Sequence, residues 1–216
     1  MSLLMKSCLL MVLCTLAVST RAQPRPMEEG SHYVSIAPPI ATGSDADTIE
    51  VLDVFWYGCP LCMEFEPMMT YYGGEIRGDL TMRRMPAIWN AAMRTHARVY
   101  FTAVALELAP RAHPAAFRYV QEQKLPLNTM EQAQTFFGTL GVTAEDFATA
   151  WQSDAVTGAL QKAEADTLAA GIDRVPALVV NGQYRVIRNE FVPELPELVI
   201  TANQLIRNLR DKRRVD

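Results

Sequence analysis

Two cysteines three positions apart, Cys59 and Cys62, constrain this chain more than any other feature. They follow a nearly continuous apolar, β-branched and aromatic run, Ile49 to Tyr57, which predicts a strand buried on both faces of a sheet. Pro60 suits the first turn of a helix, and apolar residues recur after it at helical spacing. The pair is therefore expected to open a helix, where unpaired backbone N–H groups and the helix dipole favour a thiolate.

A redox pair, a structural disulfide and a metal site could each use such cysteines. A disulfide across so short a loop restricts the unfolded chain by only about 2 kcal/mol, against about 3 kcal/mol for a fifteen-residue loop. A zinc site wants four ligands, and the three histidines, His32, His96 and His113, are scattered without paired spacing. The pattern favours redox chemistry, with an inert disulfide or a metal site as the alternatives.

The first 22 residues resemble a secretory signal peptide. Lys6 precedes an apolar stretch of eleven residues, Cys8 to Val18, and Thr20-Arg21-Ala22 offers an imperfect cleavage site. Eleven residues are too few to span a bilayer, which takes about 20, although an uncleaved anchor is the alternative. Cleavage there would remove two of the four cysteines and leave one close-spaced pair, so the core must come from apolar burial.

The size and charge of the remaining chain limit the number of domains and the kinds of partner that it can have. Roughly 190 residues are enough for one domain with an insertion or for two small ones. Loss of Lys6 and Arg21 would change the formal net charge from -4 to -6. Basic residues gather only near the C-terminus, from Arg207 to Arg214, where cations complement the end of a helix. We therefore expect no nucleic-acid partner.

The chain divides into an arm, a sheet and a run of helices. Residues 23–47 are rich in Pro, Gly, Ser and Asp and predict an extended arm with a short strand at 32–36. Residues 48–86 predict strand, helix and strand, and residues 171–216 predict a hairpin and a helix. The Ala-rich and Gln-rich residues 87–170 predict several helices. The order indicates an α/β domain interrupted by an all-helical insert.

Local signals predict several boundaries. Pro67 should kink the first helix, and Gly73-Gly74 should end it or weaken its last turn. Thr143 resembles a helix start, Gly171 a helix end, and Asn181-Gly182 the turn of a hairpin. Two later helices should each bury one apolar face, made of Val156, Leu160, Ala163 and Leu168 in the first and of Leu195, Leu198, Val199, Ala202, Leu205, Ile206 and Leu209 in the last.

Three stretches together resemble the DsbA family of periplasmic thiol:disulfide oxidoreductases, within the thioredoxin superfamily. They are Phe55-Trp56-Tyr57-Gly58-Cys59-Pro60, the helical insert, and Gly171 to Ala177 followed by Val180-Asn181-Gly182. The resemblance extends from about Tyr33 to the end of the chain. It implies a thioredoxin-like fold, with a central mixed sheet flanked by helices and an inserted all-helical domain.

The resemblance also implies roles at the motif. Cys59 is the exposed nucleophile and Cys62 the buried resolving thiol, and the two form the redox-active disulfide. Val175 and Pro176 match the family's cis-proline loop, which lies beside the disulfide and pairs with the substrate backbone; an ordinary turn proline is the alternative. Leu61 stands where many members carry histidine, so we expect a Cys59 pKa higher, and an oxidising power lower, than in a histidine-containing relative.

Two acids complete the candidate site. Asp53, six residues before Cys59, matches a family acid beneath the thiols. It would have a raised pKa and exchange a proton with Cys62, or else face solvent. Glu66, seven residues after Cys59, matches a second family acid and is equally well explained as a solvated or helix-stabilising residue.

The resemblance implies that the protein introduces disulfide bonds into newly secreted, cysteine-containing proteins in a Gram-negative periplasm. It implies no bound cofactor and reoxidation by a DsbB-like, quinone-linked membrane oxidase. No dimerisation domain of the kind found in DsbC-like isomerases precedes the sheet, so we expect a monomer. A disulfide reductase or isomerase, a copper or metal chaperone and a peptide-binding chaperone remain as alternatives. Helical and strand spacing favours the core or a soft peptide-binding rim, and not copper, for Met63, Met68, Met69, Met82 and Met85. The core is also expected for Trp89 and Trp151.

Overall fold

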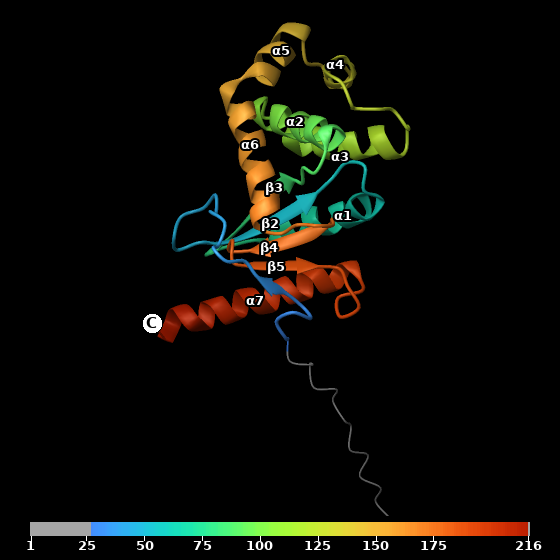
Figure 1. Cartoon of the computed structure of the whole chain (residues 1–216). Helices are drawn as coiled ribbons and strands as arrows, with labels where there is room; N and C mark the ends of the chain where they lie inside the picture. The colour runs from blue at the N-terminus through green and yellow to red at the C-terminus, as the bar shows by residue number, and fades with distance from the viewer. Residues whose placement is uncertain (1–26, 216) are drawn as a thin grey trace, which may run out of the picture.

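A computed structural model of the chain describes residues 27–215 (Figure 1). The expected signal peptide at residues 1–22 lies outside the described residues. The strands are β1 (Val34–Ser35), β2 (Ile49–Phe55), β3 (Leu80–Pro86), β4 (Ala177–Val180) and β5 (Tyr184–Ile187). They form one mixed sheet in the order β1-β5-β4-β2-β3. The predicted thioredoxin-like sheet, with a run of helices between β3 and β4, is confirmed.

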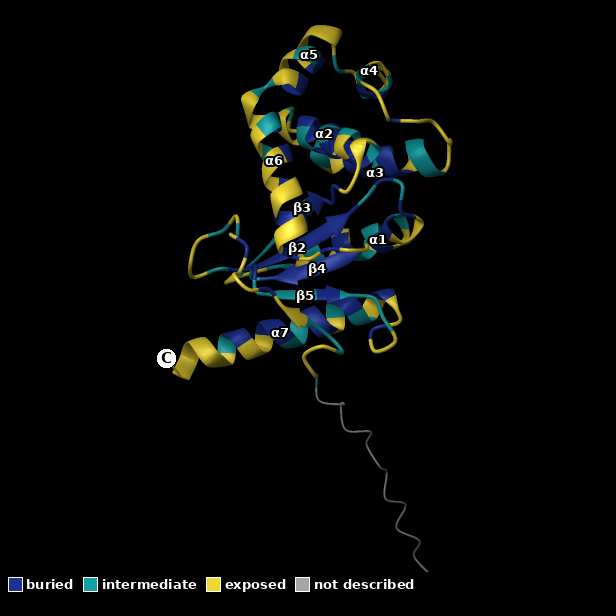
Figure 2. Cartoon of the chain, in the orientation of Figure 1, coloured by how far each residue is buried: buried dark blue, intermediate teal, exposed yellow. Residues whose placement is uncertain are grey.

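Strand β2 is the centre of the sheet and of the core. All seven of its residues are buried, because β3 pairs with it in parallel on one side and β4 antiparallel on the other (Figure 2). Its side chains alternate between two apolar layers. Leu52 and Val54 pack with helices of the insert, whereas Ile49 and Val51 pack with the first and last helices. This double burial explains the nearly continuous apolar run in the sequence, which Glu50 and Asp53 interrupt.

The predicted hairpin connects β4 and β5. Asn181 and Gly182, in the three-residue turn between these strands, both have positive φ, 52° and 65°, which asparagine and glycine adopt more readily than other residues. A Cβ on Gly182 would lie 2.0 Å from the carbonyl oxygen of Ile40, so no other residue fits there. The predicted strand in the arm is also present, as the two residues of β1, which pair antiparallel with β5.

Helix α1 (Pro60–Glu75) leads from the end of β2 back along the sheet. It continues through Pro67, and Gly73 and Gly74 lie within its last turn without ending it. Gly73 lets α1 pack closely on β3, because a Cβ there would lie 2.7 Å from the terminal methyl of Met82, which would have to move.

The predicted helical stretch contains α2 (Ala91–Ala105), α3 (Ala109–Gln121), α4 (Met130–Thr139), α5 (Ala144–Gln152) and α6 (Asp154–Ala169). Thr143 caps α5 as expected, its hydroxyl accepting from the backbone N–H of Asp146 at 3.1 Å. Leu168 does not belong to the buried face of α6, since it is 84% exposed and the neighbouring Thr167 is buried in its place. The hydrophobic pattern predicted the wrong residue for that face, because a polar Thr167 can be buried when its hydroxyl has a partner. The Thr167 hydroxyl donates to the carbonyl of Ala163 at 2.7 Å.

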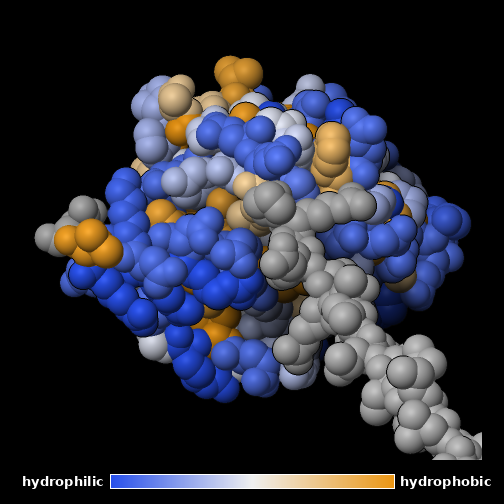
Figure 3. Space-filling view, turned by 90° about the horizontal axis from the view of Figure 1, so that it is seen from below, coloured by the Kyte–Doolittle hydropathy of each residue, from blue (hydrophilic) through white to orange (hydrophobic). Residues whose placement is uncertain are grey.

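Helix α7 (Leu195–Val215) covers the opposite face of the sheet from α2 and α6 (Figure 1). Its expected apolar face is buried, except that Val199 is only partly covered and Thr201 is buried beside it. The outer surface on this side is mostly hydrophilic, with scattered hydrophobic side chains (Figure 3). Two of its basic residues serve the fold, because Arg210 pairs with Asp79 at 2.5 Å and Arg213 donates to the carbonyl of Asp47 at 2.7 Å. Among the described residues no helix is long and apolar enough to cross a membrane.

Candidate active site

The two cysteines lie where β2 ends and α1 begins. Cys59 is the N-cap of α1, and its sulfur accepts the backbone N–H of Cys62 at 3.2 Å. Pro60 occupies the first helical turn, where a missing N–H is harmless. Both cysteines are free thiols in the structure. The helix therefore directs its unpaired N–H groups at the sulfur of Cys59, as the sequence predicted.

The pKa values of the two thiols are shifted in opposite directions. The pKa of Cys59 is lowered to about 7, chiefly by the hydrogen bond from the Cys62 thiol, against the effect of burial and with help from the backbone N–H groups of Cys62 and Leu61. Burial, above all, raises the pKa of Cys62 well above its ordinary value. The expected difference in exposure is small, because Cys59 is 8% and Cys62 3% exposed. Acidity, more than accessibility, therefore distinguishes the two thiols.

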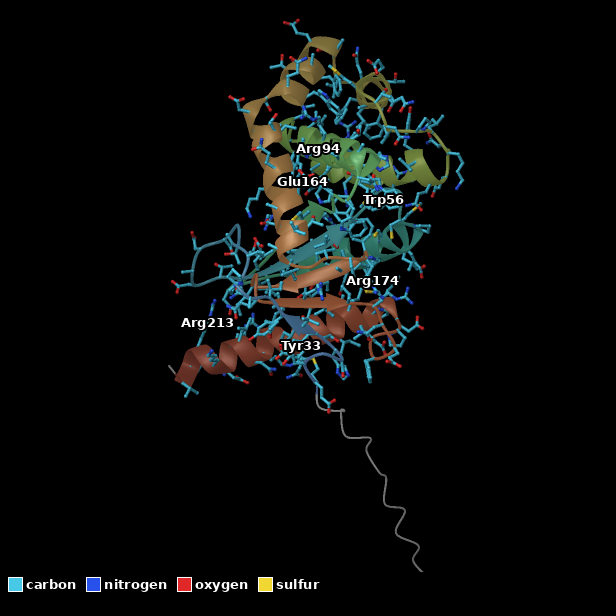
Figure 4. All side chains as sticks on the ribbon, viewed as in Figure 1. Tyr33, Trp56, Arg94, Glu164, Arg174 and Arg213 are labelled. Atoms are coloured by element: carbon cyan, nitrogen blue, oxygen red, sulfur yellow. The ribbon has the colours of Figure 1, made fainter. Side chains whose placement is uncertain are left out.

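The loop before β4 packs against the first cysteine. The Val175-Pro176 peptide bond is cis, as the resemblance implied, and Cys59 Sγ donates to the carbonyl of Val175 at 3.5 Å. Trp56 and Arg174, in the two loops that meet here, lie at the same end of the sheet (Figure 4). A cavity of about 440 Å³ opens beside this loop, lined by Leu61, Arg174, Val175, Pro176, Arg188, Asn189 and Pro193.

Asp53 is buried in the middle of β2, with only 2% of its surface exposed. Burial raises the pKa of its carboxyl to about 7, the neighbouring Arg84 lowers it, and Glu66 raises it again. Arg84 Nε lies 3.6 Å from Asp53 Oδ2. The expected raised pKa is confirmed, and the alternative of a solvent-facing strand residue is wrong. Asp53 in turn raises the pKa of Cys62, as the smallest of several contributions.

Glu66 is the centre of a hydrogen-bonded cluster on α1. It accepts from Arg84 Nη2 at 2.8 Å, from the Thr70 hydroxyl at 2.6 Å and from His113 Nε2 at 2.9 Å. Burial would raise the pKa of Glu66, but the hydrogen bond from His113, followed by the charge of Arg84 and the hydrogen bond from Thr70, holds it below its usual value. With 11% of its side chain exposed, Glu66 is not a solvated acid, whereas the alternatives of a functional and of a helix-stabilising acid both stay predictions. The cluster lines a cavity of about 670 Å³ bordered by α1, β3 and α3.

Four residues of this region were not found from the sequence. Arg84 is the register partner of Asp53 on β3, and His113 and Tyr57 extend the Glu66 cluster. Gln121, at the end of α3, donates its side-chain amide to the carbonyl of Tyr57 at 2.8 Å and to the carbonyl of Cys59 at 2.9 Å. The sequence offered a signal for Arg84 alone, as a charged residue within a predicted strand. The contacts that α3 makes with the active-site loop depend on tertiary packing, which leaves no local pattern.

No group of three or more His, Cys, Asp or Glu residues in the described part of the chain could hold an ion. Met69 and Met85 are buried in the core. Trp151 is also buried, whereas Trp89 is 44% exposed and donates its indole N–H to the carbonyl of Ile172 at 2.8 Å, so its assignment to the core is wrong.

A thioredoxin-like sheet that presents a dithiol at a helix N-terminus, beside a cis-proline, defines a class of thiol:disulfide oxidoreductases. The family model described as DSBA-like thioredoxin domain matches residues 77–197, more than half of the chain, beginning after the two cysteines. The chain belongs to this family.

Individual relatives agree with the family match. The thiol:disulfide interchange protein DsbA of Azotobacter vinelandii is 32% identical over 172 residues, which are 78% of this chain and 80% of the relative. The DsbA of Burkholderia cepacia is 27% identical over 96% of this chain and 97% of its own length. The crystal structure of Pseudomonas aeruginosa DsbA superposes with a TM-score of 0.80 at 29% identity, covering 86% of this chain and 95% of that one.

Proposed function

We propose that this protein introduces disulfide bonds into newly secreted proteins in the periplasm, through the Cys59–Cys62 pair. As a member of its family it is a thiol:disulfide oxidoreductase. The observation that carries the proposal is the unequal acidity of the two thiols, with the pKa of Cys59 lowered and that of Cys62 raised. An acidic, stabilised leaving thiolate at Cys59 favours the reduced enzyme and makes its disulfide an oxidant.

The reaction follows from this asymmetry. A client thiolate attacks the Cys59 sulfur of the oxidised enzyme, the Cys59–Cys62 bond breaks, and the electron pair goes to the sulfur of Cys62. Cys62 cannot remain a thiolate in its buried position, so it takes a proton, for which the Asp53 carboxyl with a pKa of about 7 is the proposed donor. A second client thiolate attacks the client sulfur of the mixed disulfide, and Cys59 leaves as a thiolate. The client is oxidised by two electrons, and the enzyme holds the dithiol.

The client is proposed to dock as an extended segment beside the cis-proline. The loop from Arg174 to Pro176 lies next to Cys59, and the 440 Å³ cavity at this loop is bordered by Leu61. An extended peptide could pair with the backbone of Val175, as in strand addition. Two cationic side chains, Arg174 and Arg188, line this cavity.

Export, reoxidation and quaternary state complete the proposal. The N-terminal segment is proposed to be a cleaved signal peptide that delivers the protein to the periplasm. The dithiol left by each turnover must pass two electrons onward, and a DsbB-like membrane oxidase is the proposed acceptor. The protein is proposed to act as a monomer without a bound cofactor.

Trapping of mixed disulfides tests this function. In a Cys62→Ala variant, a mixed disulfide at Cys59 can no longer be resolved by Cys62 and is released only by a second client thiol, so covalent adducts with exported cysteine-containing proteins should accumulate. Cys59→Ala is the matched control and should trap none. Absence of adducts in the Cys62→Ala protein would contradict dithiol exchange with protein clients.

A reductase is the second candidate, favoured by one observation. The Cys59 pKa of about 7 equals the value of about 7 known for thioredoxin, whereas a DsbA cysteine has a value of about 3.5. Leu61 supplies no imidazole that could lower it further. The reduction potential of the pair decides between the two candidates.

A further inference from the structure

His113 connects the helical insert to the active-site loop through two buried hydrogen bonds. The residue lies on α3 and is only 3% exposed. Its Nδ1 is 3.0 Å from the hydroxyl of Tyr57, two residues before Cys59, and its Nε2 is 2.9 Å from Oε2 of Glu66 on α1. The imidazole therefore joins three elements that are far apart in the sequence.

The two partners determine the tautomer of the ring. An ionised carboxylate only accepts hydrogen bonds, so Nε2 must carry the proton that Glu66 receives. Burial lowers the pKa of His113, against the opposing effect of Glu66, so the ring is neutral and its Nδ1 accepts from the Tyr57 hydroxyl. Burial also raises the pKa of Tyr57 well above its usual value, which keeps that hydroxyl a donor. Every polar atom of the ring is thus satisfied in one orientation.

On its other side, Glu66 competes with Asp53 for one guanidinium. Arg84 donates to Glu66 at 2.8 Å but approaches Asp53 only to 3.6 Å. Arg84 lowers the pKa of Asp53, and the negative charge of Glu66 raises it. The position and charge of Glu66 therefore influence Asp53 in two ways that act in the same direction.

The remaining ionisable neighbours do not alter this direction. Tyr100, on α2, packs edge-on against the imidazole of His113 with ring centroids 5.5 Å apart. Burial raises the pKa of Tyr100 to about 12, so it is neutral near pH 7. Cys62, whose pKa is raised, is also neutral there. The charges that face Asp53 near neutral pH are thus those of Arg84 and Glu66.

We propose that His113 is a positioning residue for the exchange reaction: by fixing the Glu66 carboxylate against Arg84, it withholds the guanidinium from Asp53, the proton carrier of the proposed function. The inference rests on that proposed role of Asp53. It assigns the helical insert a part in the chemistry, because His113 on α3 makes the only hydrogen bond to Oε2 of Glu66 among the described residues.

Removal of the imidazole has a defined consequence. In His113→Phe, Glu66 stays ionised near pH 7 but loses the hydrogen bond that fixes its Oε2. A carboxylate that is no longer held in place leaves the Arg84 guanidinium freer to approach Asp53, which lowers the pKa of Asp53. Opposite charges within hydrogen-bonding range shift such values by about 1 to 3 units. We expect the pKa of Asp53 to fall by about one unit, because Arg84 stays on β3 and only the division of its guanidinium between Glu66 and Asp53 changes.

Carbon NMR titration of the reduced protein, with aspartate labelled at its carboxyl carbon, tests the proposal. Asp53→Asn identifies the resonance by its loss, and the wild-type midpoint should lie near pH 7. His113→Phe should lower the midpoint by about one pH unit, and His113→Gln, which keeps an N–H donor for Glu66, should restore much of it. His113→Leu replaces His113→Phe if the latter fails to fold.

Two controls separate this role from a purely structural one. His96→Phe removes another buried histidine, one without a carboxylate partner, and should leave the Asp53 midpoint unchanged. In a Glu66→Gln background, His113→Phe should cause no further fall, because its effect passes through the hold of the Glu66 carboxylate on Arg84.

The proposal is overturned if His113→Phe leaves the midpoint of Asp53 unchanged, if His96→Phe lowers it equally, or if the fall persists undiminished in the Glu66→Gln background. The readout does not depend on the direction of disulfide exchange. A reducing potential of the wild-type protein would overturn the oxidase function and leave the comparison of midpoints intact.

Discussion

Replacement of Leu61 by histidine tests how the thiolate of Cys59 is stabilised. Leu61 is 37% exposed, follows the N-cap cysteine by two positions, and its backbone N–H already helps to lower the pKa of Cys59. A histidine there would add a side chain that can carry positive charge beside the sulfur. Leu61→His should therefore lower the pKa of Cys59 below about 7.

The size of the effect follows from the geometry. A unit charge about 5 Å from the sulfur interacts by about 3 kcal/mol at an effective dielectric constant of about 20, or about two pKa units. The side chain at this position is 37% exposed, and an ordinary imidazole is mostly neutral at pH 7. Both effects reduce the shift, so we expect the pKa of Cys59 to fall by about one unit. A pKa near 6 raises the thiolate fraction at pH 7 from about a half to about nine-tenths. The reduced form then gains about 1 kcal/mol, which raises the reduction potential by about 20 mV.

Ultraviolet absorbance of the thiolate, followed against pH in the reduced protein, measures the pKa directly. Leu61→Gln is the matched control, because it has similar size and no charge. A glutathione equilibrium on the same proteins gives the change in potential. The reasoning is refuted if Leu61→His has the same Cys59 pKa as Leu61→Gln.

Three further predictions concern Asp53, the active-site loop held by Gln121, and the cavity beside the cis-proline. Asp53 holds its proton more tightly in the folded than in the unfolded protein, so the wild type should lose up to about 4 kcal/mol of unfolding free energy as the pH rises from 3.8 to about 7. Asp53→Asn should remove this loss and be the more stable protein at pH 8 in denaturant titrations; parallel pH curves would refute it. Gln121→Leu should cost about 1 to 3 kcal/mol, because it leaves two loop carbonyls without their donor, and should speed amide exchange at the active site; unchanged exchange counts against it. Dithiol peptides with glutamate beside their cysteine should react faster than lysine peptides at low salt, because Arg174 and Arg188 line the cavity; equal rates in the wild type and the double glutamine variant exclude this.

The sequence predicted those parts of the protein that depend on local pattern. The strand at Ile49, the helix opened by Cys59 and the hairpin at Asn181-Gly182 were all readable, because burial on two faces, proline at a helix start and a turn with positive φ each leave a short-range signature. The raised pKa of Asp53 was also predicted, from its position beneath the thiols in an otherwise largely apolar strand, where burial disfavours the charged carboxylate.

The remaining features depend on packing between elements. His113 appeared to be an isolated histidine, and only the placement of α3 against α1 brings it to Glu66. Arg84 meets Asp53 through the register of β2 and β3, which the sequence does not specify by itself. Leu168 was assigned to a buried face because hydrophobicity was weighed there without the hydrogen bond that allows Thr167 to be buried.

The reduction potential of the Cys59–Cys62 pair tests the central claim most directly. Equilibration of the purified protein with defined ratios of reduced and oxidised glutathione yields this value. The account predicts a potential above thioredoxin's about -270 mV and, because of Leu61, below the about -120 mV of DsbA. A potential at or below about -270 mV would contradict the account and identify the protein as a reductase.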